Sequence, residues 1–140
     1  MANQTTPYRG SDGRMYLNID TSKTLAATDN GLVQNVIADA ITITLPATAV
    51  GLAFTVRNAG AAASTAVGAG TGVNGSVLVK VSPNASDQIA GNAMTAADNK
   101  AIQNTKATSV VGDEVTLIGD GTAGVGWNVE RIIGTWAREA

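Results

Sequence analysis

Between residues 40 and 79 the chain carries a single charged residue, Arg57, and much of this stretch alternates between apolar and polar residues. The apolar members of the two clearest runs are Ile41, Ile43 and Leu45, followed by Leu52, Phe54 and Val56. A period of two turns one face of a β-strand towards a core. Pro46 and Gly51 interrupt the stretch, so it lacks the run of about 20 apolar residues that a membrane-spanning helix needs. It predicts two adjacent strands with one buried face.

The scarcity of charge also bears on assembly. A soluble monomer usually scatters charges over such a length, so much of this surface is expected to be covered by other protein chains. Only 14% of all residues are charged and 4% are aromatic, which leaves a core of small side chains. Small side chains bury little apolar area, at about 25 cal/mol per Å², so a single copy is expected to be modestly stable. We expect an oligomer in which residues 40–79 contribute to contacts between copies.

Short strand patterns recur along the rest of the chain. Further alternating or apolar runs lie at residues 15–19, 32–37, 77–82, 115–117 and 127–133, with Trp127, Val129, Arg131 and Ile133 on one face. Gly, Pro, Asn and Asp turns separate these runs, whereas residues 84–107 give no clear assignment. The pattern predicts an all-β fold, an antiparallel β-sandwich or barrel of jelly-roll-like type. Residues 1–22 are expected to form an extended N-terminal arm that ends in a strand, and residues 23–140 the sandwich or barrel domain.

The residues available for catalysis are few. The chain has no histidine and no cysteine, which removes the commonest general base, the commonest transition-metal ligand and the most reactive nucleophile. Asp113, Glu114 and Asp120 are candidates for acid–base chemistry, but an Asp before Asn or Gly, as at Asp29 and Asp120, is usually part of a turn. We expect no catalytic residue, no metal site and no cofactor.

Residues 70–75, GTGVNG, match the glycine spacing of dinucleotide-binding loops. Those loops follow a strand and open a helix, whereas this segment follows a Gly/Ala-rich stretch and precedes a strand pattern, so a long surface loop is the better interpretation. The nine Lys and Arg residues are spread out and the net charge is −2. We therefore expect no nucleic acid as a partner. The interrupted apolar stretch and the scarcity of catalytic residues lead us to expect no membrane and no small-molecule substrate either. The amino terminus has no apolar run behind a basic start, so we expect synthesis in a cytoplasm without secretion.

Tyr and Arg side chains are concentrated in the expected arm. These residue types often anchor protein interfaces, although a disordered terminus with ordinary solubilising residues is an equally open interpretation. The candidate contact residues of the arm are Thr5, Thr6, Pro7, Tyr8, Arg9, Arg14, Met15 and Tyr16. The two tryptophans, Trp127 and Trp136, are expected in the core or at a seam between subunits.

Five segments between residues 24 and 137 carry a family resemblance. They read TLAATDNG, AITITLPATAVGLAFTVRNAG, VKVSPNASDQIAG, VGDEVTLIGDG and GWNVERIIGTWA. Together they resemble a β-rich domain of tailed-bacteriophage structural proteins, which occurs in capsid decoration (cement) proteins and in head or tail fibres. Its distinctive anchors here are Pro46, Gly51, Pro83, Gly112, Asp113, Trp127, Gly134 and Trp136. Such anchors are structural, so they carry over a fold more safely than a function.

The resemblance implies a homotrimer on the outer surface of the capsid of a virion, made in the host cytoplasm. It would bridge neighbouring copies of the major capsid protein and stabilise the expanded head. We expect the arm to order on the capsid, so that deleting residues 2–19 leaves a folded trimer that no longer binds heads. The alternative is a trimeric head-fibre or tail-fibre module that recognises a host surface receptor, although a fibre would normally add a shaft or attachment domain. A small polysaccharide depolymerase is a more distant alternative.

Overall fold

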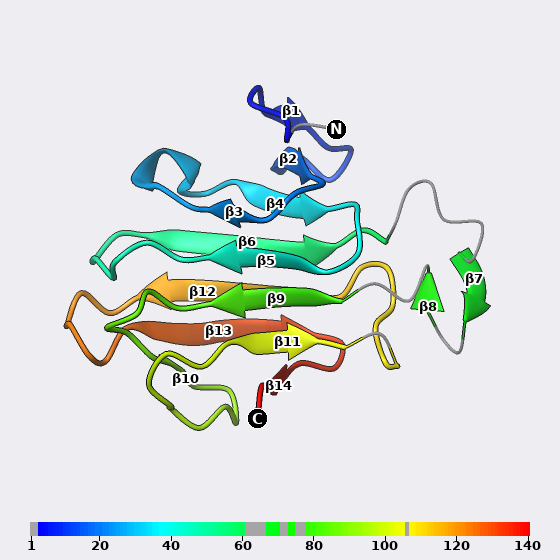
Figure 1. The fold of residues 1–140 in the computed structure, drawn as a ribbon. Helices are drawn as coiled ribbons and strands as arrows, with labels where there is room; N and C mark the ends of the chain where they lie inside the picture. The colour runs from blue at the N-terminus through cyan, green and yellow to red at the C-terminus, as the bar shows by residue number, and fades with distance from the viewer. Residues whose placement is uncertain (1–2, 61–66, 71–72, 75–77, 106) are drawn as a thin grey trace.

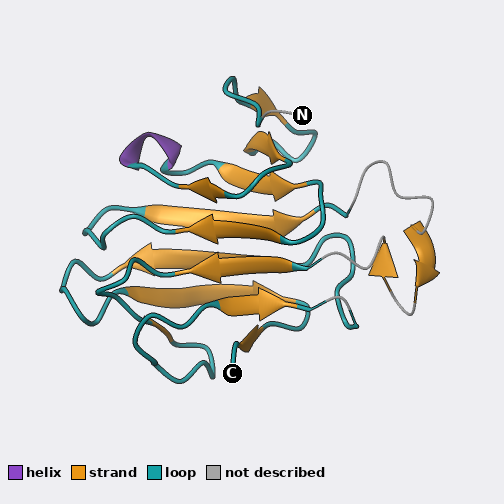
Figure 2. Cartoon of the chain, in the orientation of Figure 1, coloured by secondary structure: helices purple, strands orange, loops and turns teal. Residues whose placement is uncertain are grey.

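The computed structural model describes residues 3–60, 67–70, 73–74, 78–105 and 107–140, and its two main β-sheets pack face to face (Figure 1). The all-β prediction is confirmed, and the architecture is a sandwich. Among the described residues the helical content is a single 3-10 turn, η1 (Ala27–Asp29), drawn in purple in Figure 2. No helix in this part of the chain is long and apolar enough to cross a membrane.

Seven strands of the described residues form the larger sheet, in the spatial order β1-β2-β4-β6-β12-β13-β10. Their bounds are β1 Tyr8–Arg9, β2 Met15–Ile19, β4 Val33–Val36, β6 Ala53–Asn58, β12 Glu114–Gly119, β13 Trp127–Ile133 and β10 Ile89–Ala90. Five strands form the smaller sheet, in the order β14-β11-β9-β5-β3. Their bounds are β14 Ala137–Arg138, β11 Ile102–Asn104, β9 Val79–Ser82, β5 Ile41–Thr44 and β3 Lys23–Thr24. Strands β10 and β11 lie within residues 84–107, where the sequence pattern predicts no clear element.

The segment predicted as a long surface loop contains a small sheet of its own. Strands β7 (Val67–Gly70) and β8 (Val73–Asn74) pair antiparallel, and they lie on the connection between β6 and β9. The dinucleotide-like glycine motif therefore falls partly on this pair and partly outside the described residues. Figure 1 shows the pair beside the sandwich, away from both main sheets.

From β2 to β9 the chain alternates between the two sheets, so that β2, β4 and β6 belong to the larger sheet and β3, β5 and β9 to the smaller one. Neighbouring strands of this half are parallel: Tyr16 pairs with Val33 and Val33 with Thr55, and β3, β5 and β9 follow the same rule. This half of the chain is thus a flattened coil in which each turn supplies one strand to each sheet.

Most of the remaining strands pair antiparallel with their neighbours. Strand β12 pairs antiparallel with β6 and β13, and β11 pairs antiparallel with β9 and β14, whereas β10 runs parallel to β13. Both main sheets are therefore mixed, and the predicted antiparallel, jelly-roll-like strand arrangement is wrong. The physical reason is that consecutive strands of the first half cross between sheets, which leaves neighbours in one sheet parallel, instead of turning back as hairpins.

Strands β5 and β6 correct a second expectation. Their predicted inward faces are confirmed, because the apolar residues of both strands are buried. They are not adjacent in one sheet, however, but belong to opposite sheets and face each other across the core. Neither strand lies at the edge of its sheet, so their lack of charge follows at least in part from burial within one copy of the chain. Residues 61–66, 71–72 and 75–77 of the uncharged region lie outside the described residues.

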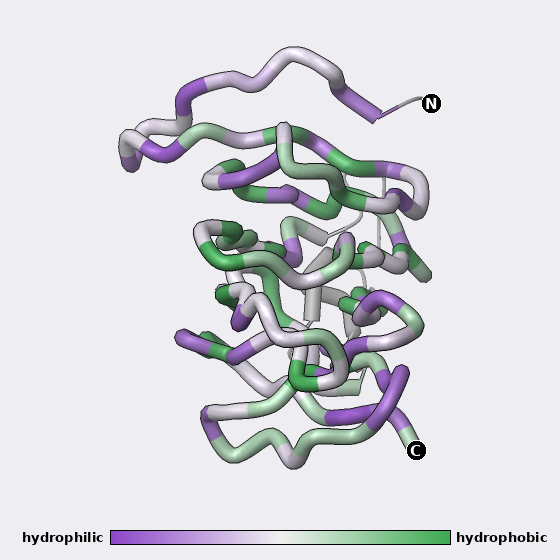
Figure 3. The backbone as a smooth tube through the Cα atoms, turned by 90° about the vertical axis from the view of Figure 1, so that its left-hand side faces the viewer, coloured by the Kyte–Doolittle hydropathy of each residue, from purple (hydrophilic) through white to green (hydrophobic). Residues whose placement is uncertain are grey.

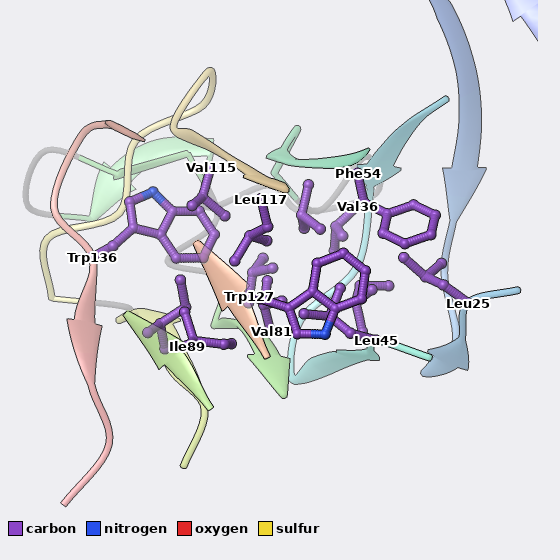
Figure 4. Packing of buried hydrophobic residues seen from close by; sticks show 14 of the residues in the cluster. Leu25, Val36, Leu45, Phe54, Val81, Ile89, Val115, Leu117, Trp127 and Trp136 are labelled. Carbon is purple, nitrogen blue, oxygen red and sulfur yellow. The ribbon is translucent and has the colours of Figure 1, made fainter. Parts of the chain in front are cut away.

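The core is a single apolar cluster between the sheets, shown in close-up in Figure 4. Trp127 is its largest fully buried side chain, 1% exposed, and its ring centroid lies 5.5 Å from that of Phe54. Trp136 is also buried, and its indole Nε1 donates to the carbonyl oxygen of Ile133 at 3.1 Å. Both tryptophans lie in the core.

A β-bulge changes the predicted faces of β13. The pairing with β12 shifts between Thr116 and Leu117, so that Thr116 pairs with Arg131 and Leu117 with Val129, which leaves Glu130 as the extra residue. Beyond this point Arg131 and Ile133 are exposed and Ile132 packs against the core. The prediction that Trp127, Val129, Arg131 and Ile133 share one face is wrong for the last two, because an extra residue moves the following side chains to the other face.

Buried polar side chains tie the sheets together near the carboxyl end of β6. The Asn58 amide donates to Asn104 Oδ1 at 2.7 Å, and Asn104 Nδ2 donates to Asp113 Oδ2 at 2.8 Å. A Cβ at Gly134, whose φ is +86°, would collide with the Asp113 carboxylate, so this position needs glycine. The anchors Gly112, Asp113, Gly134 and Trp136 all lie around this network.

The other anchors lie at strand ends. Pro46 directly follows the Leu45 that ends the β5 pattern, Pro83 follows β9, and Gly51 adopts a positive φ in the turn before β6. The same end of the sandwich is held by Asp87, whose carboxylate accepts a hydrogen bond from the backbone N–H of Thr48 at 2.9 Å. Figure 3 views the molecule from this loop end and shows the chain stacked in layers from the N-terminus to the C-terminus.

The extended N-terminal arm is not confirmed. The expected strand near its end is present as β2, and β1 pairs with it antiparallel at the edge of the larger sheet. Residues before β1 follow the same edge: the backbone N–H of Gln4 donates to the carbonyl oxygen of Asn18, and Asn3 Oδ1 accepts from the backbone N–H of Asp20. Because Leu17 and Ile19 of β2 are buried in the core, this segment is part of the sandwich.

Candidate binding surface on the larger sheet

The turn between β1 and β2 folds over the outer face of the larger sheet. It is closed by a hydrogen bond from the backbone N–H of Gly10 to the carbonyl oxygen of Arg14 at 2.8 Å, and Gly13 supplies a positive φ. A Cβ at Gly10 would collide with the ring of Tyr16, so glycine lets the turn lie on that ring. The turn carries Asp12 and Arg14 onto the sheet surface.

Arg14 reaches Glu114 on β12, across the intervening strands. Its guanidinium lies 3.2 Å from the Glu114 carboxylate, and Arg131 of β13 contacts the same carboxylate at 2.9 Å. Although Glu114 belongs to the outer face of the sheet, its side chain is only 3% exposed. A carboxylate between two guanidinium groups makes charge-assisted hydrogen bonds, which are stronger than neutral ones. The interaction fixes the β1–β2 turn against the middle of the sheet.

The carboxylates considered for acid–base chemistry are not brought together. Asp113 and Glu114 are neighbours at the start of a strand, so their side chains point to opposite faces: Asp113 into the buried network and Glu114 outwards. Asp120 lies in the turn after β12, where its Oδ1 accepts from the backbone N–H of Thr122 at 3.2 Å. Among the described residues, no group of three or more His, Cys, Asp or Glu side chains could hold a metal ion.

Asp12 organises the turn electrostatically. Its carboxylate accepts hydrogen bonds from the Tyr16 hydroxyl and from Arg14 Nε and the Arg14 backbone N–H. The bond from Tyr16, followed by those from Arg14, lowers the pKa of Asp12 from 3.8 to about 2. Burial, together with the hydrogen bond to Asp12, raises the pKa of Tyr16 above 10.0. The turn is therefore held by an ionised Asp12 and a neutral Tyr16 over most of the pH range.

This arrangement predicts an acid dependence of the hairpin. The folded-state pKa of Asp12 lies below its ordinary value, so its contribution to stability is present above pH 3.8 and is lost as the pH falls through about 2. We expect Asp12→Asn to unfold at lower urea concentration than the wild type near neutral pH, with the difference shrinking as the pH falls through that window. Urea unfolding of both chains as a function of pH measures it, and a difference that stays constant down to the lowest pH would contradict it.

A row of polar side chains crosses four strands of the same face. The Tyr8 hydroxyl donates to Asn18 Oδ1 at 2.8 Å, Asn35 Nδ2 donates to the same oxygen at 2.9 Å, and Arg57 donates to Asn35 Oδ1 at 3.0 Å. The row follows the register of the sheet, in which Asn18 pairs with Asn35 and Asn35 with Arg57. Glu114 is the cross-strand neighbour of Arg57 on β12, but its carboxylate pairs with Arg14 and Arg131, and no ion pair of Arg57 is found among the described residues.

Three side chains of this row, Tyr8, Asn35 and Arg57, lie around a hollow of about 350 Å³, which we call the polar basin. It is lined by Tyr8, Gly10, Ser11, Asp12, Arg14, Tyr16, Asn35 and Arg57. The rings of Tyr8 and Tyr16 are stacked with their centroids 5.7 Å apart, and Tyr8 is 39% exposed. Tyrosine and arginine are the residue types that most often anchor protein interfaces.

The candidate contact residues are distributed unequally around the basin. Tyr8, Arg14 and Tyr16 line it, and Arg9, which is exposed, donates to the carbonyl oxygen of Gly13. The other candidates lie outside it: Thr5 and Thr6 are exposed, and Pro7 and Met15 are half-buried. The sequence interpretation missed Asn18, Asn35 and Arg57 as partners of this segment. Their outward position could be anticipated from strand alternation, but their proximity to Tyr8 depends on the register between three strands.

Exposed aliphatic side chains lie beyond the basin on the same face, and we call them the apolar flank. Ile118 of β12 is 37% exposed and Ile133 of β13 is 42% exposed. Val50 and Val125, in the loops at one end of these strands, are also exposed. The outer face of the larger sheet thus combines aromatic and arginine side chains with aliphatic ones, a composition typical of protein–protein contact surfaces.

A second hollow, the C-terminal groove, lies between residues 92–95 and residues 132–138. Its volume is about 610 Å³, and Met94, Ile132 and Trp136 contribute apolar surface to it. Arg138 crosses towards the opposite wall, where its guanidinium donates to the carbonyl oxygen of Thr95 at 3.2 Å. The groove lies beside β14, at the edge of the smaller sheet remote from β3.

Compared with protein-family models, with curated proteins and with solved structures, the chain has no match in any of the three. The features that bear on its function are therefore its own surfaces. The larger sheet offers the polar basin and the apolar flank on one continuous face, and the C-terminal groove is a separate hollow. The first has the residue composition of a protein contact, and the second is an open groove with both polar and apolar lining.

Proposed function

We propose that the protein is a non-catalytic structural protein of a virion. It binds the outer surface of a tailed-phage capsid as a homotrimer and bridges neighbouring copies of the major capsid protein. The observation that carries the proposal is the outer face of the larger sheet, where the polar basin with Tyr8 and Arg57 lies beside the apolar flank of Ile118 and Ile133. The resemblance of residues 24–137 to phage decoration proteins supports the same role.

The contact surface of this proposal is a folded face instead of a flexible arm. The β1–β2 turn is held by Arg14 on Glu114 and by Asp12 on Tyr16, so the basin exists before any partner arrives. A preorganised surface loses less conformational entropy on binding than a disordered segment does. A protein that binds the assembled, expanded shell better than its free subunits stabilises that shell by mass action. Three copies of the face in one trimer raise the avidity by about 10² to 10⁴ without new kinds of contact.

Arg57 and Tyr8 provide the direct test. We expect Arg57→Ala and Tyr8→Ala each to weaken binding to expanded heads by roughly 30-fold, because a central interface anchor contributes about 2 kcal/mol or more. Lys80→Ala is the matched control, since it removes one positive charge from the smaller sheet, where Lys80 pairs with Glu139. Co-sedimentation of each purified variant with undecorated heads gives the affinities. Equal binding by all three variants and the wild type would reject this face as the contact.

The alternative is a trimeric head-fibre or tail-fibre module that recognises a host surface receptor, and the C-terminal groove is the observation that favours it. The two roles differ in the number of copies on each particle. A decoration protein occupies many equivalent positions over the shell, whereas a fibre module occupies few. Quantitative gel analysis of purified particles separates them, and ultracentrifugation of the free protein tests the trimer that both roles share.

A further inference from the structure

Three polar side chains meet between the sheets at the N-terminal end of the sandwich. Lys23 belongs to β3, Asp29 to η1 and Gln34 to β4, so the cluster joins the smaller sheet to the larger one. Lys23 Nζ lies 2.8 Å from Asp29 Oδ1 and 3.2 Å from Gln34 Oε1. The amine is therefore hydrogen-bonded to a carboxylate and to a carboxamide at the same time.

The local fold holds each group in place. Asp29 Oδ2 accepts a hydrogen bond from the backbone N–H of Ala26 at 2.9 Å, which leaves Oδ1 directed to Lys23. Gln34 is 0% exposed, and its strand neighbours in the sheet, Leu17 and Val56, are buried core residues. The side chains of Lys23 and Asp29 are 20% and 11% exposed, so the cluster is largely shielded from water.

The amide nitrogen of Gln34 is the one polar atom of these three side chains that is buried without a hydrogen-bond partner among the described residues. Gln34 Nε2 has less than 1 Å² of exposed surface. A buried donor without a partner is rare in folded proteins and costs the free energy of its desolvation. Gln34 Oε1, by contrast, accepts from Lys23. The oxygen of the carboxamide is therefore hydrogen-bonded, whereas its NH₂ group is not. The NH₂ group is the one that an acyl-transfer reaction would release.

We propose that Lys23 and Gln34 form an intramolecular amide cross-link, with Asp29 as the proton carrier. Lys23 Nζ lies at hydrogen-bond distance from the carbonyl oxygen of Gln34, so attack on the adjacent carbon is an intramolecular step with a lower entropic barrier, and lysine amines are established nucleophiles towards carbonyl carbon. The product joins β3 to β4, and hence one sheet to the other, by a covalent bond. It also removes the unsatisfied NH₂ group from the core.

The reaction balances without an oxidant or cofactor. The Lys23 ammonium transfers one proton to the Asp29 carboxylate, and neutral Nζ attacks Cδ of Gln34, which forms the Nζ–Cδ bond and opens the carbonyl double bond. As that double bond re-forms, the Cδ–Nε2 bond breaks and Asp29 delivers its proton to the departing nitrogen. A second proton from Nζ follows through Asp29, so the products are a secondary amide, an ammonium ion and the Asp29 carboxylate. This is general acid–base catalysis by one positioned carboxylate.

Intact-mass spectrometry and tryptic mapping of the full-length wild-type chain test the proposal. The cross-linked chain is lighter than its sequence by one ammonia molecule, and trypsin does not cleave after Lys23, so residues 15–57 appear as one fragment. Ring closure at Asn30 before Gly31 would also release ammonia, but it leaves the bond after Lys23 open to trypsin. A wild-type chain with its full sequence mass and complete cleavage after Lys23 overturns the proposal.

Variants separate the roles of the three residues. We expect two variants to lack the cross-link: Gln34→Met, which keeps the side-chain volume, and Asp29→Asn. Each should have the full mass calculated from its own sequence, and trypsin should cleave it completely after Lys23. Lys80→Arg is the control, because it changes a lysine of the same sheet that contacts Glu139, and it should keep the cross-link. A cross-link that persists in Asp29→Asn overturns the role of Asp29. If either variant fails to fold, the wild-type measurement still decides whether the bond exists.

Discussion

A chain that lacks residues 2–19 is expected to lose its cooperative unfolding transition. The deletion removes β1 and β2, and with them Leu17 and Ile19, whose side chains are buried between the sheets. Each buried aliphatic side chain of this size contributes about 1.5–3 kcal/mol. The deletion also exposes the buried strand β4 as a new edge. Against a total stability of roughly 5–15 kcal/mol for a domain, these losses leave little or no folded population.

The control for this deletion is a chain that lacks only residues 2–6. It loses the edge contacts of Asn3 and Gln4 but keeps both strands of the hairpin. We expect it to unfold cooperatively at a slightly lower denaturant concentration than the full chain. Chemical denaturation followed by circular dichroism compares the two. A 2–19 deletion that unfolds as cooperatively as the full chain would restore the interpretation of the N-terminus as a dispensable arm.

Trp127→Ala is expected to have the second-largest effect, a loss of about 3–5 kcal/mol of unfolding free energy. Trp127 is 1% exposed and packs against Phe54 of β6, which is paired to β12 and so belongs to the middle of the larger sheet. Removing the indole leaves a cavity that strands on both sides cannot fill, because they are fixed in hydrogen-bonded register. Equilibrium unfolding in urea gives the difference from the wild type.

Trp127→Phe separates volume from hydrogen bonding at this position. The indole Nε1 of Trp127 is buried and has no hydrogen-bond partner among the described residues. Phenylalanine removes that unsatisfied donor and keeps an aromatic ring against Phe54, so we expect it to cost much less than alanine does. A Phe variant as unstable as the Ala variant would show that the indole itself, and not the filling of the core, determines stability here.

The parts of the fold that the sequence predicts are those encoded by alternation within one strand. The buried faces of β5, β6 and β12 follow directly from residues such as Ile43, Phe54 and Leu117. Alternation does not indicate which strand is the neighbour of a given strand in the sheet, or in which direction that neighbour runs. The sequence pattern therefore predicts β5 and β6 as neighbours in one sheet, although they belong to opposite sheets. Alternation also cannot predict the bulge at Glu130 or the two-residue strand β10, because one inserted residue or a single apolar position produces no periodic pattern of apolar residues.

The candidate site also combines residues that the sequence can indicate with residues that only the pairing of strands brings together. Tyr8, Arg14 and Tyr16 could be singled out because they are close in sequence and of the residue types that anchor interfaces. Arg57 joins them only through the register of the parallel strands β2, β4 and β6, and Glu114 only through the antiparallel pairing of β12 with β6. The same contacts explain why the segment is not a free arm: an arginine whose carboxylate partner lies a hundred residues away cannot be recognised from its neighbours in sequence.

The flattened coil tolerates circuits of different length. Each circuit returns the backbone to the same sheet one strand further along, 17 residues on from Tyr16 to Val33 and 22 residues on from Val33 to Thr55. The parallel pairing of β2, β4 and β6 is the same on both sides of β4 although the two circuits differ in length. The β7–β8 insertion shows that a single circuit also accommodates a long detour.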